Sequence, residues 1–339
     1  MGASLEDIAL KCGCSRATVS RALDPAKKHM ISDKTRKKIE ECAQCMEYQE
    51  NISARRLRTG KTSTIAMVLP QYMLFGNPSD DFQDAQIFAE EIETAFRESA
   101  NRKYELKFNV YTKNNYPDDL EKISRSLDGT LCDGVLFFGH VPPPLEEQVK
   151  KKQLPAVLIS RDQFRNAPCP QIGLDRTPGI VLAAEHLLDL GKKRIVYLST
   201  ALKYGTGFNF NCFKDTLEKR GSSVEPVIIS NRFDIRRWVA SENFSGVDAV
   251  LCANDTMADN LVKELRFCSI NVPEDIAVIG YNKSRVFQQP GTSELSSISV
   301  DRVAMTRAGV NMLTDMISRG SCHAGDICFE TGFSRGKTS

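Results

Sequence analysis

The sequence is poor in the residues and motifs that most often carry out catalysis. It contains only four histidines and one tryptophan in 339 residues. It has no Gly-x-Ser-x-Gly elbow, no phosphate-loop lysine motif and no dinucleotide fingerprint, so the common nucleophile and nucleotide sites are not predicted. The segment Gly205-Thr206-Gly207 lacks the third glycine of such a fingerprint. We therefore expect no enzymatic activity and no bound cofactor.

The segments that direct a chain to or through a membrane are also missing. No apolar stretch approaches the ~18 residues that a membrane-spanning helix needs. The first seven residues contain no basic stretch followed by an apolar one, so no signal peptide is expected. The 11 cysteines are odd in number and scattered through apolar runs, which favours reduced thiols over a disulfide framework. These features predict a cytoplasmic protein without membrane contact.

A large excess of one charge is absent from the chain as a whole but not from its beginning. The formal net charge is only +2. Residues 1–61 carry 13 Lys and Arg against 8 Asp and Glu, whereas the remainder carries 32 against 35. A basic N-terminal part on a slightly acidic body predicts a polyanionic partner for the N-terminal part alone.

The first 48 residues show the signals of three short helices. Ser4 begins a segment that resembles a capping box, and Ser15 and Ser32 are placed to cap the second and third helices. Gly13 is expected to end the first helix and Pro25 the second. Apolar residues recur at helical spacing in each segment, which predicts an all-α domain with its own small core.

The spacing of Ala9, Gly13 and Val19 matches a helix-turn-helix. This motif needs a small residue where two helices touch, a glycine in the turn and an inward-facing β-branched residue. Its second helix would enter the major groove, where Arg can bind guanine, Ala can contact a thymine methyl group and short hydroxyls can bind phosphates. A solvated face of a three-helix domain is the alternative. The DNA contacts predicted in this domain are Ser4, Ser15, Arg16, Ala17, Thr18, Ser20 and Arg21.

Residues 49–61 are basic and contain one leucine among three arginines, which is too little apolar surface to pack alone. We interpret them as a linker that becomes helical only against a partner.

From Ser63 onward, apolar segments alternate with amphipathic helical ones. This order predicts parallel sheets covered on both faces, and the strands are too many for one compact sheet. We therefore predict two doubly wound α/β lobes with a cleft between them. The predicted strands are Thr64–Leu69, Leu106–Tyr111, Gly134–Phe138, Ala156–Ser160, Arg194–Leu198, Pro226–Ile229, Ala249–Ala253, Ile276–Gly280 and Ser297–Val300.

Three segments of the N-terminal part resemble the LacI-type family of lactose and purine repressors in their order and spacing. They are Ser4–Ala9, Gly13–Leu23 and Asn51–Gly60, and later matches occur at Glu185–Gly191, Ala253–Ala258 and Val272–Tyr281. The resemblance covers nearly the whole chain. It implies a periplasmic-binding-protein-like core and a homodimer that binds double-stranded, near-palindromic operator DNA. Since no heptad extension follows the last strand, we expect a dimer rather than a tetramer.

The resemblance also assigns DNA contacts to the linker, which it identifies as a hinge helix. These contacts are Asn51, Ala54, Arg55, Leu57 and Arg58. Leu57 would enter the minor groove as an apolar wedge and open it to the flanking arginines; a minor packing contact is the alternative for this side chain.

Two positions near the hinge depart from the family. Relatives usually have glycine after the third helix and proline before the hinge asparagine, whereas this chain has Glu47 and Glu50. Both would place negative charge near the DNA backbone.

The resemblance implies that a small effector, a sugar or sugar derivative, binds in the cleft at the carboxyl ends of strands. Arg161 and Asp162 would end a strand there, and Asp175 would follow the first crossover. Asp255 would accept from ligand hydroxyls; the alternative is a cap for the helix that starts at Thr256, and both roles can hold. The effector residues predicted in this way are Phe75, Arg161, Asp162, Asp175, Phe208, Asn209, Asp255, Tyr281 and Asn282.

Several of these positions leave the effector open. Relatives often carry Arg where this chain has Asn209 and Asp where it has Asn282, so the cleft could have lost its ligand. Phe75, Phe208 and Phe210 could stack on a ring or belong to the core. The pairs Cys12, Cys14 and Cys42, Cys45 resemble zinc ligands, but small residues occupy these positions in the family, so no metal is expected.

We therefore predict a sequence-specific transcription regulator, a repressor, whose operator affinity an effector controls. A solute-binding protein, a ligand-independent regulator and a sugar-processing enzyme are the alternatives. The expected domains are residues 1–48 (helix-turn-helix), 49–61 (hinge), 62–161 with 292–322 (N-terminal lobe), and 162–291 with 323–339 (C-terminal lobe).

Overall fold

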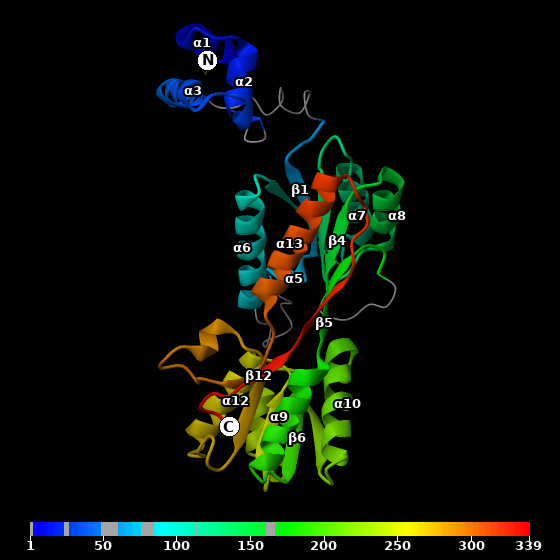
Figure 1. Ribbon diagram of the computed structural model, residues 1–339. Helices are drawn as coiled ribbons and strands as arrows, with labels where there is room; N and C mark the ends of the chain where they lie inside the picture. The colour runs from blue at the N-terminus through cyan, green and yellow to red at the C-terminus, as the bar shows by residue number, and fades with distance from the viewer. Residues whose placement is uncertain (1–2, 24–26, 49–59, 76–84, 113, 161–166) are drawn as a thin grey trace. The chain divides into compact units, whose positions relative to one another are not determined.

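The computed structural model describes residues 3–23, 27–48, 60–75, 85–112, 114–160 and 167–339. The chain divides into two compact units, Met1–Lys61 and Thr62–Ser339, which we call the head and the core. Figure 1 shows the elements of both units.

The head consists of short helices. Its elements are α1 (Leu5–Cys12), α2 (Arg16–Leu23), η1 (Lys28–Met30) and α3 (Asp33–Cys45). The predicted capping box is confirmed, because Ser4 Oγ accepts from Asp7 N at 3.3 Å and Ser4 N donates to Asp7 Oδ2 at 2.8 Å. The hydrogen bonds that the Asp7 carboxylate accepts from Ser4 N and Ser4 Oγ lower its pKa. The first helix ends at Gly13, whose φ of 65° is left-handed and suits glycine.

Three fully buried side chains form the centre of the head, one from each α-helix: Ile8, Val19 and Ile39. Ala9, Cys12, Ala22 and Ala43 complete this core. Cys12 is therefore used as a small apolar residue, and burial raises the pKa of its thiol.

The core contains two sheets. The first has the strand order β11-β5-β4-β3-β1-β2 and the second β12-β10-β9-β8-β6-β7. The strands are β1 (Thr64–Pro70), β2 (Glu105–Tyr111), β3 (Gly134–Phe138), β4 (Ala156–Ile159), β5 (Gln171–Asp175), β6 (Arg194–Ser199), β7 (Ser223–Ile228), β8 (Ala249–Cys252), β9 (Ala277–Asn282), β10 (Ser296–Ser299), β11 (Ile327–Glu330) and β12 (Gly332–Ser334). Neighbouring strands run parallel except β12, which is antiparallel to β10.

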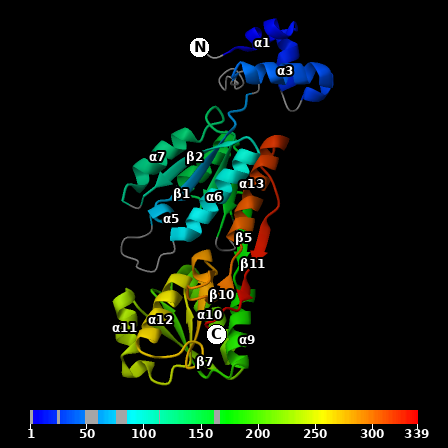
Figure 2. The ribbon, with the colours of Figure 1, turned by 90° about the vertical axis from the view of Figure 1, so that its left-hand side faces the viewer.

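Helices cover both faces of each sheet, as predicted. They are α5 (Tyr72–Phe75), α6 (Ala85–Asn101), α7 (Tyr116–Ser126), α8 (Pro143–Lys152), α9 (Thr177–Asp189), α10 (Tyr204–Glu218), α11 (Arg232–Val239), η2 (Glu242–Phe244), α12 (Asp255–Phe267), η3 (Arg285–Gln288) and α13 (Arg302–Arg319). Figure 2 shows α6 and α13 side by side against the first sheet.

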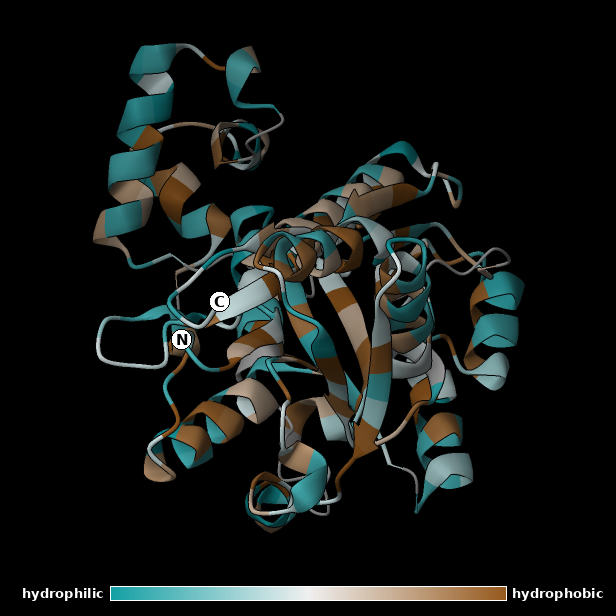
Figure 3. Cartoon of the chain, turned by 90° about the horizontal axis from the view of Figure 1, so that it is seen from below, coloured by the Kyte–Doolittle hydropathy of each residue, from teal (hydrophilic) through white to brown (hydrophobic). Residues whose placement is uncertain are grey.

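The alternation of side chains along β1 explains this layering. Ile65, Met67 and Leu69 pack with α6 and α13, whereas Ala66 and Val68 face α7 and α8. The second sheet is covered in the same way by α9 and α10 on one face and α11 and α12 on the other. Figure 3 shows hydrophobic bands along the central strands.

All nine predicted strands are present, but β5, β11 and β12 were missed. β5 is short and contains a glycine, and β11 and β12 are at most half-buried. None of these three strands forms the continuous apolar run on which the prediction was based.

The sheet to which each strand belongs corrects the predicted lobe boundaries. We call the first sheet with its helices lobe 1 and the second sheet with its helices lobe 2. β5 belongs to lobe 1, so the first crossover follows Asp175 rather than residue 161. β10 lies in lobe 2, and the chain returns to α13 after it; β11 lies in lobe 1 and β12 in lobe 2. The hydrogen bonds between strands, rather than sequence order, decide these assignments.

Candidate functional site

The second helix of the head separates a buried face from a polar one. Val19 and Ala22 are buried in the head core, whereas Arg16, Ala17 and Arg21 are exposed. The polar face is therefore available to a partner, which is the arrangement that the helix-turn-helix prediction requires.

Short hydroxyl groups surround the beginning of α2. Ser15 Oγ accepts from Thr18 N at 3.1 Å and lies 2.9 Å from Thr18 Oγ1. Ser15 is exposed, while Thr18 and Ser20 are half-buried. Ser4 donates its hydroxyl hydrogen to Asp7 Oδ2 at 2.7 Å, so its oxygen serves the capping box of α1.

One exposed ion pair lies on the polar face. Arg16 Nη1 is 3.0 Å from Glu6 Oε1 of α1, and both side chains are about three-fifths exposed. Such a pair is weak because water screens both charges. Arg16 can therefore exchange Glu6 for a nucleic-acid acceptor at little cost.

Glu47 adopts a backbone conformation that the sequence alone did not reveal. Its φ is 48°, in the left-handed region that favours glycine. Tyr48 N donates to Ala43 O at 2.9 Å, so Glu47 forms the turn that ends α3. A side chain with a Cβ atom is strained here, in addition to the negative charge that the sequence predicted.

The predicted hinge contacts Asn51, Ala54, Arg55, Leu57 and Arg58 lie outside the described residues, as does Glu50. The structure does show how the core begins. Thr62 N and Oγ1 donate to Asp133 Oδ1 at 2.7 and 2.9 Å, and Ser63 N donates to Asp133 Oδ2 at 2.8 Å. Asp133 therefore anchors the first two residues of the core to the loop before β3.

In the core, Asp175 ends β5 and precedes the first crossover, which corrects the predicted order. Its carboxylate accepts from Thr177 N at 2.9 Å. Its carbonyl oxygen accepts from Thr331 N at 2.9 Å. This bond joins the crossover after β5 to the crossover between β11 and β12.

Arg176 connects two predicted effector residues and was missed by the sequence analysis. Its Nη1 lies 3.5 Å from both Asn209 Oδ1 and Tyr281 Oη. Asn209 and Tyr281 are almost fully buried. Tyr197 lies beside them, and its own burial raises the pKa of its hydroxyl well above the usual range. No sequence signal marks Arg176, because it matches no motif and its neighbours come from α10 and β9.

Asp255 is fully buried, and its carboxylate accepts hydrogen bonds from other groups of the protein. Its Oδ1 accepts from Ser297 Oγ at 2.7 Å and its Oδ2 from Ser284 N at 2.6 Å. Gly280 leaves space for it, since a Cβ there would lie 2.1 Å from Asp255 Oδ1. The alternative role as helix cap is wrong: Asn254 caps α12 by accepting from Met257 N at 2.8 Å.

Asn282 contacts an arginine from the other lobe. Its Oδ1 accepts from Arg302 Nη2 at 2.7 Å, and Arg302 Nη1 lies 3.2 Å from Glu91 Oε1 of α6. The φ of Asn282 is 111°, which is an unusual conformation outside glycine.

The remaining aromatic candidates divide. Phe210 packs on Tyr197 with ring centroids 5.6 Å apart and so belongs to the hydrophobic interior of lobe 2. Phe208, on the same helix, is about half exposed. Arg161 and Asp162 lie outside the described residues, and nothing is described of the Phe75 side chain.

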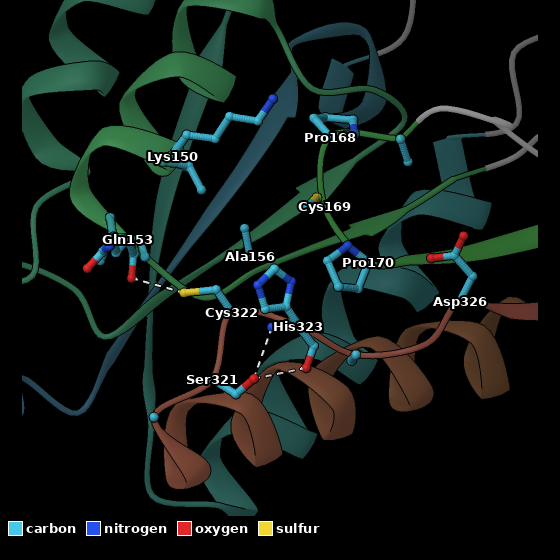
Figure 4. Close-up of a pocket in the computed structure, with 15 residues that line it drawn as sticks. Lys150, Gln153, Ala156, Pro168, Cys169, Pro170, Ser321, Cys322, His323 and Asp326 are labelled. Atoms are coloured by element: carbon cyan, nitrogen blue, oxygen red, sulfur yellow. Dashed lines mark hydrogen bonds between the residues drawn. The ribbon is translucent and has the colours of Figure 1, made fainter.

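A cavity of about 830 Å³ lies elsewhere in lobe 1 (Figure 4). Its walls come from the end of α8, the segment before β5 and the segment before β11, and they include Cys169, Pro170, Cys322 and His323. It therefore lies at the amino ends of strands. Of the predicted effector residues that the structure describes, none lines it.

Comparison with known proteins decides the family. Residues 4–51 match the model of bacterial regulatory proteins of the LacI family, and residues 184–336 match the periplasmic-binding-protein-like domain. The chain belongs to the LacI family. This LacI-family chain is thus a DNA-binding transcription regulator, with the two-part architecture that the sequence predicted.

A curated relative is similar over most of the chain, and two solved structures share its fold. The transcriptional regulator DegA of Bacillus subtilis is 27% identical over 296 residues, which cover 84% of this chain and 82% of DegA. The lac repressor dimer bound to operator and an anti-inducer has a TM-score of 0.74 at 18% identity, covering 100% of this chain and 99% of the repressor chain. The complex of the transcriptional regulator CelR with cellobiose has a TM-score of 0.65 at 21% identity, covering 99% and 100%.

Within the described residues, no helix is long and apolar enough to cross a membrane.

Proposed function

We propose that this LacI-family regulator is a repressor that binds a near-palindromic operator as a homodimer. The observation that carries the proposal is the polar face of α2, where Arg16, Ala17 and Arg21 are exposed opposite the buried Val19 and Ala22. Exposed arginine and small apolar groups on such a helix are suited to reading base edges. The lac repressor structure, which has the same fold, is a dimer on its operator.

The proposal is tested by selecting genomic DNA fragments with the full-length protein. We expect one near-palindromic motif, lost with Arg21→Ala and blurred with Leu57→Ala. The matched control is Arg237→Ala, which removes an exposed arginine from α11 of the core and should select the same motif. Failure to enrich any motif at low and moderate salt would contradict operator binding. Light scattering should give the mass of a dimer.

We further propose that a sugar or sugar derivative, bound between the lobes, controls operator affinity. Support comes from Arg176, Asn209 and Tyr281, polar groups that lie together where β5 and β9 end. Carboxyl ends of parallel strands are the usual ligand edge of such folds. A structural neighbour, CelR, binds cellobiose.

A panel of mono- and disaccharides, including cellobiose, tests this proposal through the thermal unfolding of the full-length protein. A sugar that binds should raise the midpoint. The increase should vanish in Asn209→Ala and persist in Asn211→Ala, which changes an exposed residue of the same helix.

A ligand-independent regulator is the second candidate. Two predicted effector residues favour it, because Asp255 is bound by Ser284 and Ser297 and Asn282 by Arg302. Operator binding without any sugar-induced shift would support this candidate over ligand control.

A further inference from the structure

The two lobes are joined by contacts between side chains as well as by the chain itself. Arg302, the first residue of α13 in lobe 1, donates to Asn282 Oδ1 of lobe 2 at 2.7 Å. A second contact, between Arg285 Nε of lobe 2 and Glu90 Oε1 of lobe 1, is 3.5 Å long and the arginine is about three-quarters exposed. The first contact is shorter and better shielded from water, so it is the stronger of the two.

Arg302 is held in place within lobe 1. Its guanidinium forms an ion pair with Glu91 of α6 at 3.2 Å, and the two side chains are only 10% and 6% exposed. A buried charge must keep its partner, since leaving either group alone is costly. Glu91 therefore fixes the position from which Arg302 reaches lobe 2. Arg302 Nε, which is also buried, has no hydrogen-bond partner among the described residues.

Asn282 is held just as firmly within lobe 2. The next two backbone nitrogens are bound: Lys283 N donates to Ser297 Oγ at 3.0 Å and Ser284 N to Asp255 Oδ2 at 2.6 Å. Asn282 and Lys283 both have positive φ values, 111° and 54°. Two consecutive strained residues persist only where their surroundings hold them. Buried Asp255 provides this support and so presents the Asn282 amide to Arg302.

We propose that Arg302 is the positioning residue that sets the arrangement of the two lobes, acting as a latch between Glu91 of lobe 1 and Asn282 of lobe 2. Asp255 serves the latch by holding residues 282–284 rather than by binding effector hydroxyls. A latch of this kind has two states, bonded and open, which any ligand between the lobes would have to bias. Its effect on DNA rests on the proposed control of operator binding by the lobes.

The test measures amide hydrogen exchange of residues 283 and 284 in the full-length protein. Arg302→Lys keeps a cation for Glu91 but shortens the reach to Asn282. We expect exchange in the lobe 2 loop to rise at least about fivefold, although residue 302 touches neither amide. Adding Asn282→Asp to Arg302→Lys should restore slow exchange, because a carboxylate attracts the lysine.

Two further variants keep the test decisive if Arg302→Lys folds poorly. Asn282→Asp alone should slow exchange at residues 283 and 284, since Arg302 then faces a full negative charge. Arg285→Ala is the matched control and should leave exchange within about twofold of wild type, because it removes only the exposed pair. Unchanged exchange in both Arg302→Lys and Asn282→Asp would overturn the latch.

The consequence for function is read separately from the affinity for a selected DNA fragment. Arg302→Lys and Asn282→Asp should change this affinity in opposite directions, each at least about fivefold. If exchange responds as expected while DNA affinity does not, the latch stands and the proposed control of operator binding by the lobes fails.

Discussion

The head and lobe 2 use their polar residues in opposite ways. On α2 of the head, Arg16 and Arg21 are exposed, and the Arg16 bond to Glu6 is open to water. In lobe 2, Asp255 and Asn282 are engaged by hydrogen bonds with protein groups. A surface that reads an external partner keeps its polar groups exposed, whereas a surface that must hold one arrangement of lobes satisfies them internally. Substitutions in the two regions should therefore affect different properties.

The largest effect is expected at Asp255. Asp255→Ala removes the acceptor for Ser284 N and Ser297 Oγ and should lower the free energy of unfolding by about 3 kcal/mol. Denaturant unfolding of the full-length protein measures the change. A loss below about 1 kcal/mol would show that these buried bonds are replaced by water.

Gly280→Ala sharpens this result through a double-mutant cycle. In the wild type, the added Cβ would meet the Asp255 carboxylate, so the substitution should be strongly destabilising. In the Asp255→Ala background the same substitution should cost much less, because Oδ1 and Cγ are gone and only the contact of 3.2 Å with the Cα atom of residue 255 remains. Equal costs in both backgrounds would contradict the contact.

In the head, Arg21→Ala should leave stability nearly unchanged but weaken DNA binding. Because Arg21 is exposed, its loss removes little packing. The loss of one arginine contact to a base should cost about 1–3 kcal/mol of binding discrimination. Fluorescence anisotropy on a selected fragment and a mismatched one separates lost specificity from lost charge. Equal weakening on both fragments would indicate a phosphate contact instead.

Glu47→Gly should stabilise the head by about 1 kcal/mol, because glycine accepts a φ of 48° without strain. Glu47→Ala is the control, since it removes the charge but keeps the Cβ atom. Thermal unfolding should improve only for glycine, whereas DNA affinity should improve for both variants if the charge also repels phosphates. Equal stability of the two variants would remove strain as the cause.

The smallest effect is expected for Glu6→Gln. This change breaks an exposed ion pair, so stability should stay within about 0.5 kcal/mol of wild type. Arg16 loses its competing carboxylate, and DNA affinity should rise slightly at low salt and not at high salt. A clear loss of affinity would show that Glu6 positions Arg16 rather than competing with DNA.

The sequence by itself determined the family, the three helices of the head and most strands of the core. These features depend on local signals: caps such as Ser4, the left-handed turn at Gly13, and apolar runs such as Ile65–Leu69. Each of these features can be predicted from the sequence because residues close together along the chain make the interactions that stabilise it.

Only the tertiary structure decided where the lobes begin and how the predicted effector residues are used. Gln171–Asp175 joins lobe 1 because it pairs with β4 and β11, and pairing between strands leaves no trace in the order of residues. Arg176 meets Asn209 and Tyr281, and Arg302 meets Asn282, across 20 or more positions of sequence. Which donor reaches which buried acceptor depends on packing in three dimensions, so Asp255 could be identified as polar and important but not as the support of a bond between lobes.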